Sequence, residues 1–81
     1  MNYNDLLEYV KRELEGCDAH ISIALDNMDK YRCSLDNACD YIVDRIESAI
    51  SDYCSDNDID EFDTYEVFGK DIEDIFFDAI G

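Results

Sequence analysis

Residues 35–54 carry the longest helical pattern in the sequence, and they restrict the fold more than any other segment. At about 100° per residue, nine apolar side chains of this segment fall within an arc of roughly 140°. Ser34 stands directly before the pattern, where an N-cap is expected. The segment therefore predicts one continuous helix with a buried face. The nine residues are Leu35, Ala38, Cys39, Ile42, Val43, Ile46, Ala49, Ile50 and Tyr53.

Four further segments of the chain have patterns that predict a helix or a helix start. Residues 4–15 have helical apolar spacing, with Asn4 as the expected cap and Gly16 after the end. Residues 18–32 also fit a helix, although "HISIAL" alternates as a short strand would. Residues 58–61 have the spacing of a capping box, and residues 71–80 resume the helical pattern. We predict a compact all-α bundle of four to five short helices, with an α+β fold containing a strand near residues 20–25 as the alternative.

The length of 81 residues predicts a single acidic helical domain, residues 1–81, because so short a chain has no material for a second core. Apolar residues make up 47% of the chain, which is too many for a disordered acidic tail. The sequence has no basic-then-apolar leader and no apolar run of about 20 residues. We therefore expect a cytoplasmic protein, with its four cysteines reduced and no membrane association.

The charge is strongly negative and unevenly distributed. The chain has 22 acidic and 6 basic residues, for a formal charge of −16. Residues 1–32 hold seven acids and four bases, whereas residues 33–81 hold fifteen acids and two bases. Such a charge opposes compaction by self-repulsion, so we expect it to serve a purpose other than stability. It excludes direct binding to nucleic acid or to an anionic membrane, and a basic protein is the natural partner.

The acids of residues 33–81 are predicted to form one anionic surface. On a continuous helix the first four would lie within roughly 80° of one another, and the stretch "SDNDIDEFDTYE" would extend this stripe. Neighbouring acids on the stripe would stand about 6 Å apart along the helix axis. Together with that stretch and the acids of residues 71–78, they could supply a charge density comparable to that of a DNA strand, which has one phosphate per about 3.4 Å. Tyr41, Tyr65 and Phe77 lie beside the apolar arcs and could anchor a partner. The residues predicted to contact the partner are Asp36, Asp40, Asp44, Glu47, Asp56, Asp58, Asp60, Glu61, Asp63, Glu66, Asp71, Asp74 and Asp78.

A calcium site is the first alternative use of these acids. Asp56, Asp58 and Asp60 have the spacing of the first three ligands of an EF-hand loop. That loop also needs glycine at its sixth position and glutamate at its twelfth, where this chain has Glu61 and Val67. We therefore predict no bound metal here.

Zinc binding and catalysis are the next alternatives. Cys17, His20, Cys33 and Cys39 supply zinc-type ligands, but their intervals match no compact zinc finger. His20 is the sole histidine, and no recognisable signature pairs it with a nucleophile. We predict a protein that is not an enzyme and carries no cofactor.

Two further classes stay open as alternatives. Ser34-Leu35-Asp36 resembles the Asp-Ser-Leu phosphopantetheine attachment motif of acyl carrier proteins, with Cys33 in place of the motif's aspartate. That resemblance implies a prosthetic arm on Ser34. A structural dimerisation module is the other class, so homodimer formation remains possible.

The opening "MNYNDLLEYVK" is similar to the start of one acidic Cas9-inhibitor family, through Met1, Asn2, Asn4, Asp5 and Leu6. In size, charge and lack of proline the chain resembles the small acidic inhibitors of bacteriophages and mobile elements, which include DNA mimics and anti-CRISPR proteins. The resemblance implies a stoichiometric blocker of a basic nucleic-acid-binding protein, such as a CRISPR effector, in the host bacterial cell. That family is mixed α and β, which favours the strand alternative for "HISIAL".

Overall fold

The computed structural model describes residues 2–81, except for the side chains of residues 61–63, and within that part the fold is all-α. The strand expected as an alternative near residues 20–25 is wrong, because those residues lie within one helix. The prediction of a small helical bundle is confirmed, with six helices among the described residues instead of four or five. The helices are α1 (Tyr3–Glu13), α2 (Asp18–Tyr31), α3 (Leu35–Ala38), α4 (Asp40–Asn57), α5 (Glu61–Phe68) and α6 (Ile72–Ile80).

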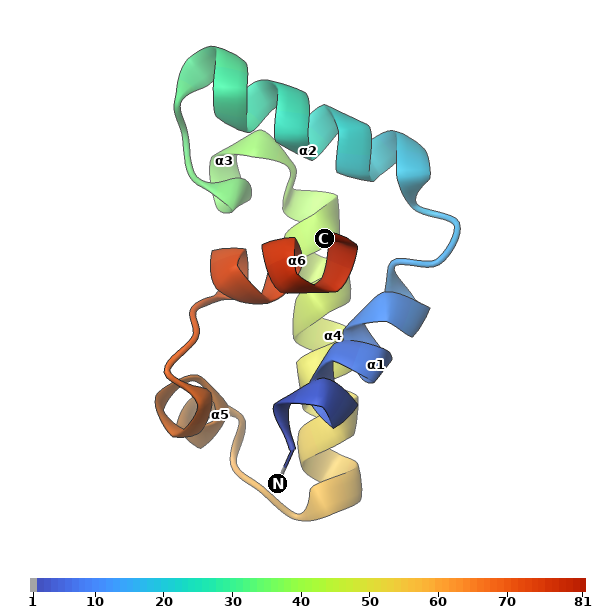
Figure 1. The fold of residues 1–81 in the computed structure, drawn as a ribbon, viewed down its shortest axis with the longest axis vertical. Helices are drawn as coiled ribbons and strands as arrows, with labels where there is room; N and C mark the ends of the chain where they lie inside the picture. Colours follow the sequence, from blue (N-terminus) through green and yellow to red (C-terminus); the bar gives the residue numbers. More distant parts are fainter. Residues whose placement is uncertain (1) are drawn as a thin grey trace.

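Helix α4 is the centre of the bundle. It runs along the longest of the three dimensions, 38 × 24 × 19 Å, with α1 and α6 packed against it. Figure 1 shows α2 crossing one end of the molecule and α5 lying toward the other. The core is formed by the apolar stripes of these helices, including the fully buried Leu6 and Val10 of α1, Ile42 and Ile46 of α4, and Phe76 of α6. Burying these stripes is the main favourable term in folding.

Helix α1 has its N-cap two residues earlier than its sequence pattern predicts. Asn2, and not Asn4, is the N-cap, because its side chain accepts a 2.9 Å hydrogen bond from the backbone N–H of Asn4. The chain leaves the helix after Glu13 and turns at Gly16. Gly16 has φ +82°, a conformation that glycine adopts without steric cost.

The predicted continuous helix over residues 35–54 is wrong, because the chain breaks at Cys39. This residue is extended, with φ −163° and ψ 96°, and it separates α3 from α4. Two tertiary hydrogen bonds hold the short α3 in place. The backbone N–H of Leu35 donates to Glu73 Oε1 at 3.0 Å, and the carbonyl of Ala38 accepts from Asn27 Nδ2 at 3.1 Å. Partners on α6 and α2 thus satisfy backbone groups of the short helix.

The last two helices have clear ends. Asp58 is the left-handed C-cap of α4, with φ 56°, so the helix start expected at this residue is wrong. Helix α5 ends at Phe68, directly before Gly69, which has φ +63°. Asp71 and Asp74 form a complete capping box at the start of α6. The side chain of Asp71 accepts from the N–H of Asp74 at 2.9 Å, and that of Asp74 accepts from the N–H of Asp71 at 3.3 Å.

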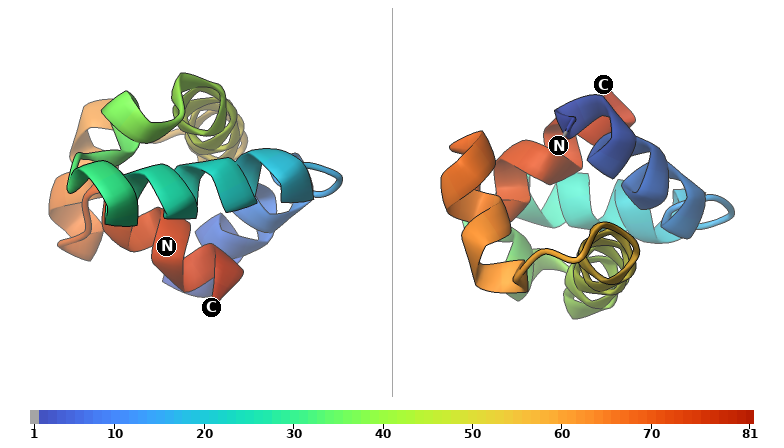
Figure 2. Two further views of the ribbon diagram at one scale, coloured as in Figure 1. Left: turned by 90° about the horizontal axis from the view of Figure 1, so that it is seen from above. Right: turned by 90° about the horizontal axis from the view of Figure 1, so that it is seen from below.

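Helix α2 is the least buried of the longer helices. Ala24 is its single buried residue, whereas Leu25 and Tyr31, which share the helical apolar spacing of this segment, are 38% and 64% exposed. The ring of His20 stacks on that of Tyr41 with centroids 4.2 Å apart, and this contact joins α2 to α4. Seen from above in Figure 2, α2 lies across the end of the bundle, over α1 and α6.

Candidate interaction site

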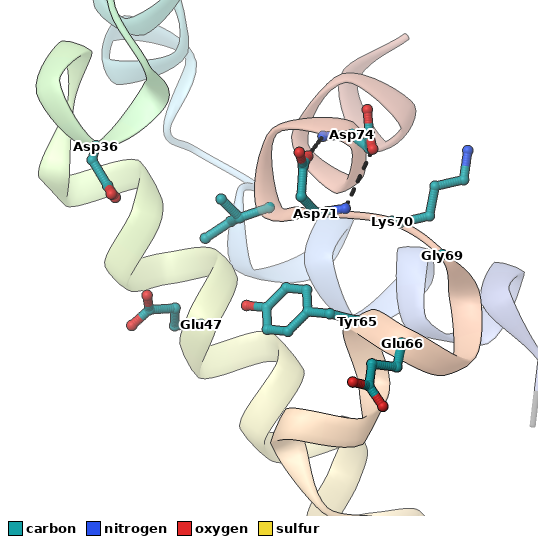
Figure 3. Close-up of a pocket in the computed structure, with 9 residues that line it drawn as sticks. Asp36, Glu47, Tyr65, Glu66, Gly69, Lys70, Asp71 and Asp74 are labelled. Atoms are coloured by element: carbon teal, nitrogen blue, oxygen red, sulfur yellow. Dashed lines mark hydrogen bonds between the residues drawn. The ribbon is translucent and has the colours of Figure 1, made fainter.

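An open groove of about 600 Å³ lies where α3, α4, α5 and α6 approach one another (Figure 3). Four helices and the turn before α6 contribute to it, so the groove depends on the tertiary fold. We call it the acidic groove, because carboxylates predominate among its lining residues. These residues are Asp36, Glu47, Tyr65, Glu66, Gly69, Lys70, Asp71, Ile72 and Asp74.

Each wall of the acidic groove carries acids from a different part of the chain. Figure 3 shows Asp36 of α3 and Glu47 of α4 on one side, and Asp71 and Asp74 at the start of α6 on another. Glu66 of α5 lies below them in this view. All five side chains belong to exposed residues, so their charges meet solvent. The break at Cys39 does not remove Asp36 from this surface, although it ends the predicted helical stripe.

The capping box fixes two of the five groove acids. Asp71 and Asp74 each accept one backbone N–H hydrogen bond, and a carboxylate has about four acceptor sites. Both carboxylates therefore keep capacity for an external donor. Their reciprocal bonds also reduce the rotamer freedom that a partner would otherwise have to restrict.

Lys70 is the one basic residue among those that line the acidic groove. Its Nζ lies 3.4 Å from Asp78 Oδ2 and 5.5 Å from the centroid of the Tyr3 ring. The other ion pair among the described side chains joins Arg45 to Glu13. The five groove carboxylates belong to neither pair, so no internal ion pair of the described residues neutralises them.

Asp78 contacts α1 outside the acidic groove. Its Oδ2 accepts a 2.5 Å hydrogen bond from the hydroxyl of Tyr3, and this bond and then the nearby Lys70 lower the pKa of Asp78. Partial burial, followed by the bond to Asp78, raises the pKa of Tyr3. Asp78 therefore ties the last helix to the first, which is a structural task that its sequence pattern did not reveal.

Asp56 also lies apart from the acidic groove. It follows Glu47 by nine residues on α4, which is half a turn out of phase at about 100° per residue. Its carboxylate accepts a 2.6 Å hydrogen bond from Tyr9, and this bond raises the pKa of the Tyr9 hydroxyl. Asp56 lines a second groove of about 370 Å³ that also contains Arg12. Extending the helical projection beyond residue 54 would have revealed the change of side.

The remaining predicted acids are divided between α4 and the link to α5. Asp40 and Asp44 are exposed and share the α4 face of Glu47, at spacings of seven and three residues. Asp58 and Asp60 lie between α4 and α5, and the backbone carbonyl of Asp60 accepts a hydrogen bond from Thr64. The predictions for Glu61 and Asp63 fall outside the described side chains.

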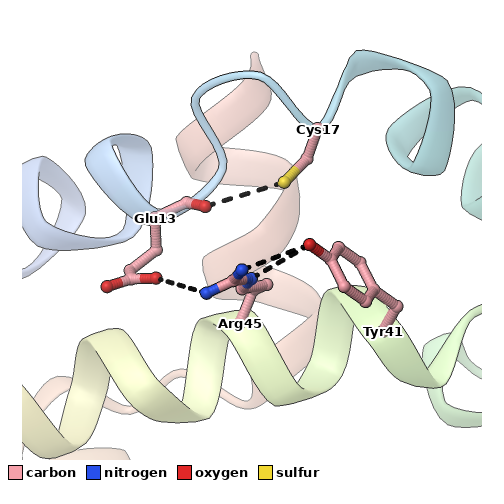
Figure 4. A network of polar contacts seen from close by, with 4 residues as sticks. All are labelled: Glu13, Cys17, Tyr41 and Arg45. Atoms are coloured by element: carbon pink, nitrogen blue, oxygen red, sulfur yellow. Dashed lines mark hydrogen bonds and ion pairs between the residues drawn. The ribbon is translucent and has the colours of Figure 1, made fainter.

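A polar network crosses from α1 to α4 (Figure 4), on a different side of α4 from Glu47. Arg45 Nη1 lies 3.3 Å from Glu13 Oε2, and its Nε and Nη2 donate to the Tyr41 hydroxyl at 3.3 and 3.2 Å. That hydroxyl holds the pKa of Arg45 above its usual value. Tyr41, expected as a partner anchor, is therefore engaged internally with Arg45 and His20. Tyr65, the second expected anchor, lines the acidic groove.

The candidate ligands for zinc have other contacts. Cys17 Sγ donates to the backbone oxygen of Glu13 at 3.7 Å, and Cys33 Sγ donates to that of Asn27 at 3.6 Å. All four cysteines are free thiols. Across the described part of the chain, no three His, Cys, Asp or Glu side chains are grouped as they would be around a metal ion.

Ser34, the residue expected to carry a prosthetic arm in the acyl carrier alternative, is the N-cap of α3. Its hydroxyl accepts a 3.3 Å hydrogen bond from Asn37 Nδ2. The expectation of an N-cap at Ser34 is thus confirmed, although the helix that it begins has only four residues.

No protein-family model, curated protein or solved structure matches the chain. The resemblance to acidic phage inhibitors therefore rests on the residues and composition described above. Within the described residues, no helix combines the length and the apolar character needed to cross a bilayer.

Proposed function

We propose that this protein is a non-enzymatic, acidic inhibitor that occupies the nucleic-acid-binding surface of a basic protein. The observation that carries the proposal is the acidic groove, in which separate helices bring five carboxylates around one open volume of about 600 Å³. Arginine and lysine side chains are its natural occupants, because they can donate to carboxylates from more than one wall.

The α4 face next to the groove supports a nucleic-acid-like charge pattern. Asp40, Asp44 and Glu47 span seven residues of one helix, or about 10 Å of its axis. A DNA strand presents one phosphate per about 3.4 Å of axis, so three carboxylates over this length approach its density. The helix is anchored in the core and holds these charges at fixed spacing, as a phosphate backbone does.

The expected target is a nucleic-acid-binding effector of a bacterial defence system, with a CRISPR effector as the leading class, met in the cytoplasm of the host. Long-range attraction would steer the encounter, and binding would release condensed ions. The target would then be blocked stoichiometrically, since nothing in this role requires turnover. The resemblance of the N-terminal residues to an acidic Cas9-inhibitor family directs the search to this class.

Capture of proteins from a bacterial lysate on immobilised wild-type protein, at about 0.05 and 0.5 M salt, tests the proposal. We expect basic nucleic-acid-binding proteins to be retained at low salt and lost at high salt. The DNA affinity of each purified target, measured with and without this protein, then shows whether the two ligands compete. Targets that bind DNA and this protein simultaneously would contradict the proposal.

Two fourfold variants with the same total charge separate local geometry from net charge. The first converts Asp36, Asp40, Asp44 and Glu47 to lysine and should abolish capture. The matched control converts four exposed acids of α1 and α2, namely Asp5, Glu8, Asp26 and Asp29, to lysine and should retain most of it. Equal loss in both variants would show that only the overall charge matters, and unchanged capture by the first would show that the acidic face is misassigned.

A further inference from the structure

A second surface, with a different character from the acidic groove, lies where α1, α2 and α6 meet. A groove of about 300 Å³ is lined there by Leu14, Ile21, Ala79 and Ile80, with charged residues only at Lys11 and Asp18. Figure 1 shows the C-terminal half of α6 between α1 and α2, on the side of the molecule that faces the viewer. We call this surface the apolar groove.

Two exposed apolar residues extend the apolar groove along its two helices. Leu25 follows Ile21 by one turn of α2 and is 38% exposed. Phe77 precedes Ile80 by one turn of α6 and is 45% exposed. A stable dimer buries about 800 Å² per copy, so the extension beyond the groove itself is what would make such a surface large enough.

The charged residues that line the apolar groove indicate what kind of partner would bind there. The formal charge of −16 would make two copies of the chain repel each other in general. The apolar groove instead carries one cation and one anion, Lys11 at the end of α1 and Asp18 at the start of α2. In a twofold dimer, every contact between two different residues occurs twice, once from each copy. Lys11 of each copy can therefore face Asp18 of the other.

We propose that the apolar groove, extended by Leu25 and Phe77, is a self-association surface through which two copies of this chain pair about a twofold axis. The pairing buries apolar side chains that the monomer leaves in water, and it matches Lys11 with Asp18 twice. The acidic groove is lined by a separate set of residues, so each copy in the dimer keeps its own. The inference does not rest on the proposed function.

Sedimentation equilibrium from about 10 μM to about 1 mM protein, at about 0.15 M salt, tests the self-association. Wild type should show a concentration-dependent dimer. Phe77→Lys should raise the dimer dissociation constant by about tenfold or more, as expected for loss of an aromatic anchor. The matched control is Val67→Lys, because Val67 is 50% exposed on α5, outside this surface, and it should leave the dissociation constant unchanged. Circular dichroism verifies that both variants are folded.

A charge exchange tests the orientation of the two copies. Lys11→Asp should weaken the dimer, because two acidic side chains then face each other. The double variant Lys11→Asp/Asp18→Lys should restore it, because the acid at position 11 of each copy then faces the base at position 18 of the other. A wild-type protein that remains monomeric throughout the range would overturn the proposal. A dimer that is insensitive to Phe77→Lys, or a charge exchange that does not rescue, would overturn it equally. Loss of target capture by Phe77→Lys from a monomeric wild type would assign the surface to the target and refute self-association.

Discussion

The acidic groove and the contact between α1 and α4, which we call the seam, differ in how their charged side chains are partnered. At the seam, Arg45 lies 3.3 Å from Glu13, and the Tyr9 hydroxyl donates to Asp56, so each acid has a partner on the facing helix. In the acidic groove, the lining holds five carboxylates and a single lysine, and the ammonium group of that lysine pairs with Asp78 outside the groove. The chain has six cations for 22 acids and places Arg45 where two helices must dock. The contacts that join α1 to α4 and the acids proposed to bind a partner thus lie on different sides of the same central helix.

The largest test of this division compares neighbouring residues of α4. Ile46 is fully buried and Glu47 lines the acidic groove. Ile46→Ala should lower the free energy of unfolding by about 2–5 kcal/mol, through lost burial and the resulting cavity. Glu47→Ala should change it by no more than about 0.5 kcal/mol. Urea denaturation measures both, and a large loss for Glu47→Ala would mean that the acidic groove supports the fold.

A smaller effect separates the two roles of Asp71, which caps α6 and lines the acidic groove. Asp71→Ala should cost about 1 kcal/mol, because the N–H of Asp74 loses its acceptor. Asp71→Asn removes the same charge but keeps a capping oxygen, so its stability should stay close to that of wild type. Thermal denaturation of the pair distinguishes capping from charge, and equal losses would contradict the capping role.

The dependence of stability on salt tests the same comparison, with an expected effect of a few tenths of a kcal/mol. Raising salt from about 0.05 to 0.5 M should stabilise the wild type, because it screens repulsion among the unpaired acids. The double variant Glu47→Gln/Glu66→Gln should gain about 0.2–0.5 kcal/mol at low salt, the usual size of one relieved like-charge contact. Its response to salt should also be smaller. A variant with an unchanged salt response would show that these two carboxylates do not repel each other measurably.

The smallest expected effect concerns pH and the contact between Tyr3 and Asp78. The pKa of Asp78 is lowered in the fold. Its contribution to the free energy of unfolding is therefore present above the usual value of 3.8 and is lost as pH falls through the lowered pKa. The pKa of Tyr3 is raised from 10.0, so its contribution to the free energy of unfolding is present below pH 10 and is lost at higher pH.

Tyr3→Phe removes this contact and should be less stable than wild type near neutral pH, with the difference shrinking at both extremes. The matched control is Tyr31→Phe, since Tyr31 is 64% exposed and should show no such profile. Thermal melts across the pH range give the comparison. A difference that is independent of pH would rule out the hydrogen bond as its source.

The local sequence pattern was enough to find the longer helices, but not the helix ends that depend on tertiary contacts. The apolar period predicted the helices that became α1, α2, α4 and α6, because amphipathic spacing reports directly which side is buried. It missed the break at Cys39, since that residue lies on the apolar arc and no glycine or proline marks the position. The break is held by Asn27 and Glu73, which only the tertiary fold brings to α3.

The candidate site shows the same limit. Reasoning from charge and helical spacing placed thirteen acids on one surface, and five of them line one groove, although their helices come together only in the fold: Asp36, Glu47, Glu66, Asp71 and Asp74. The same reasoning could not show that Asp56 and Asp78 accept hydrogen bonds from tyrosines of α1. Those contacts join positions 47 and 75 residues apart, so no local pattern reveals them. Whether the selected acids bind a partner stays a prediction.

The bond from the Leu35 N–H to Glu73 has a consequence for the order of events during synthesis. The acceptor is translated 38 residues after the donor, which at about 5–20 residues per second is a delay of seconds. Until α6 has been synthesised and has left the ribosome, the N–H of Leu35 lacks its acceptor on Glu73. A nascent chain stalled before Glu73 would therefore lack the contact that joins α3 to α6, and the native arrangement around α3 would form only after α6 is available.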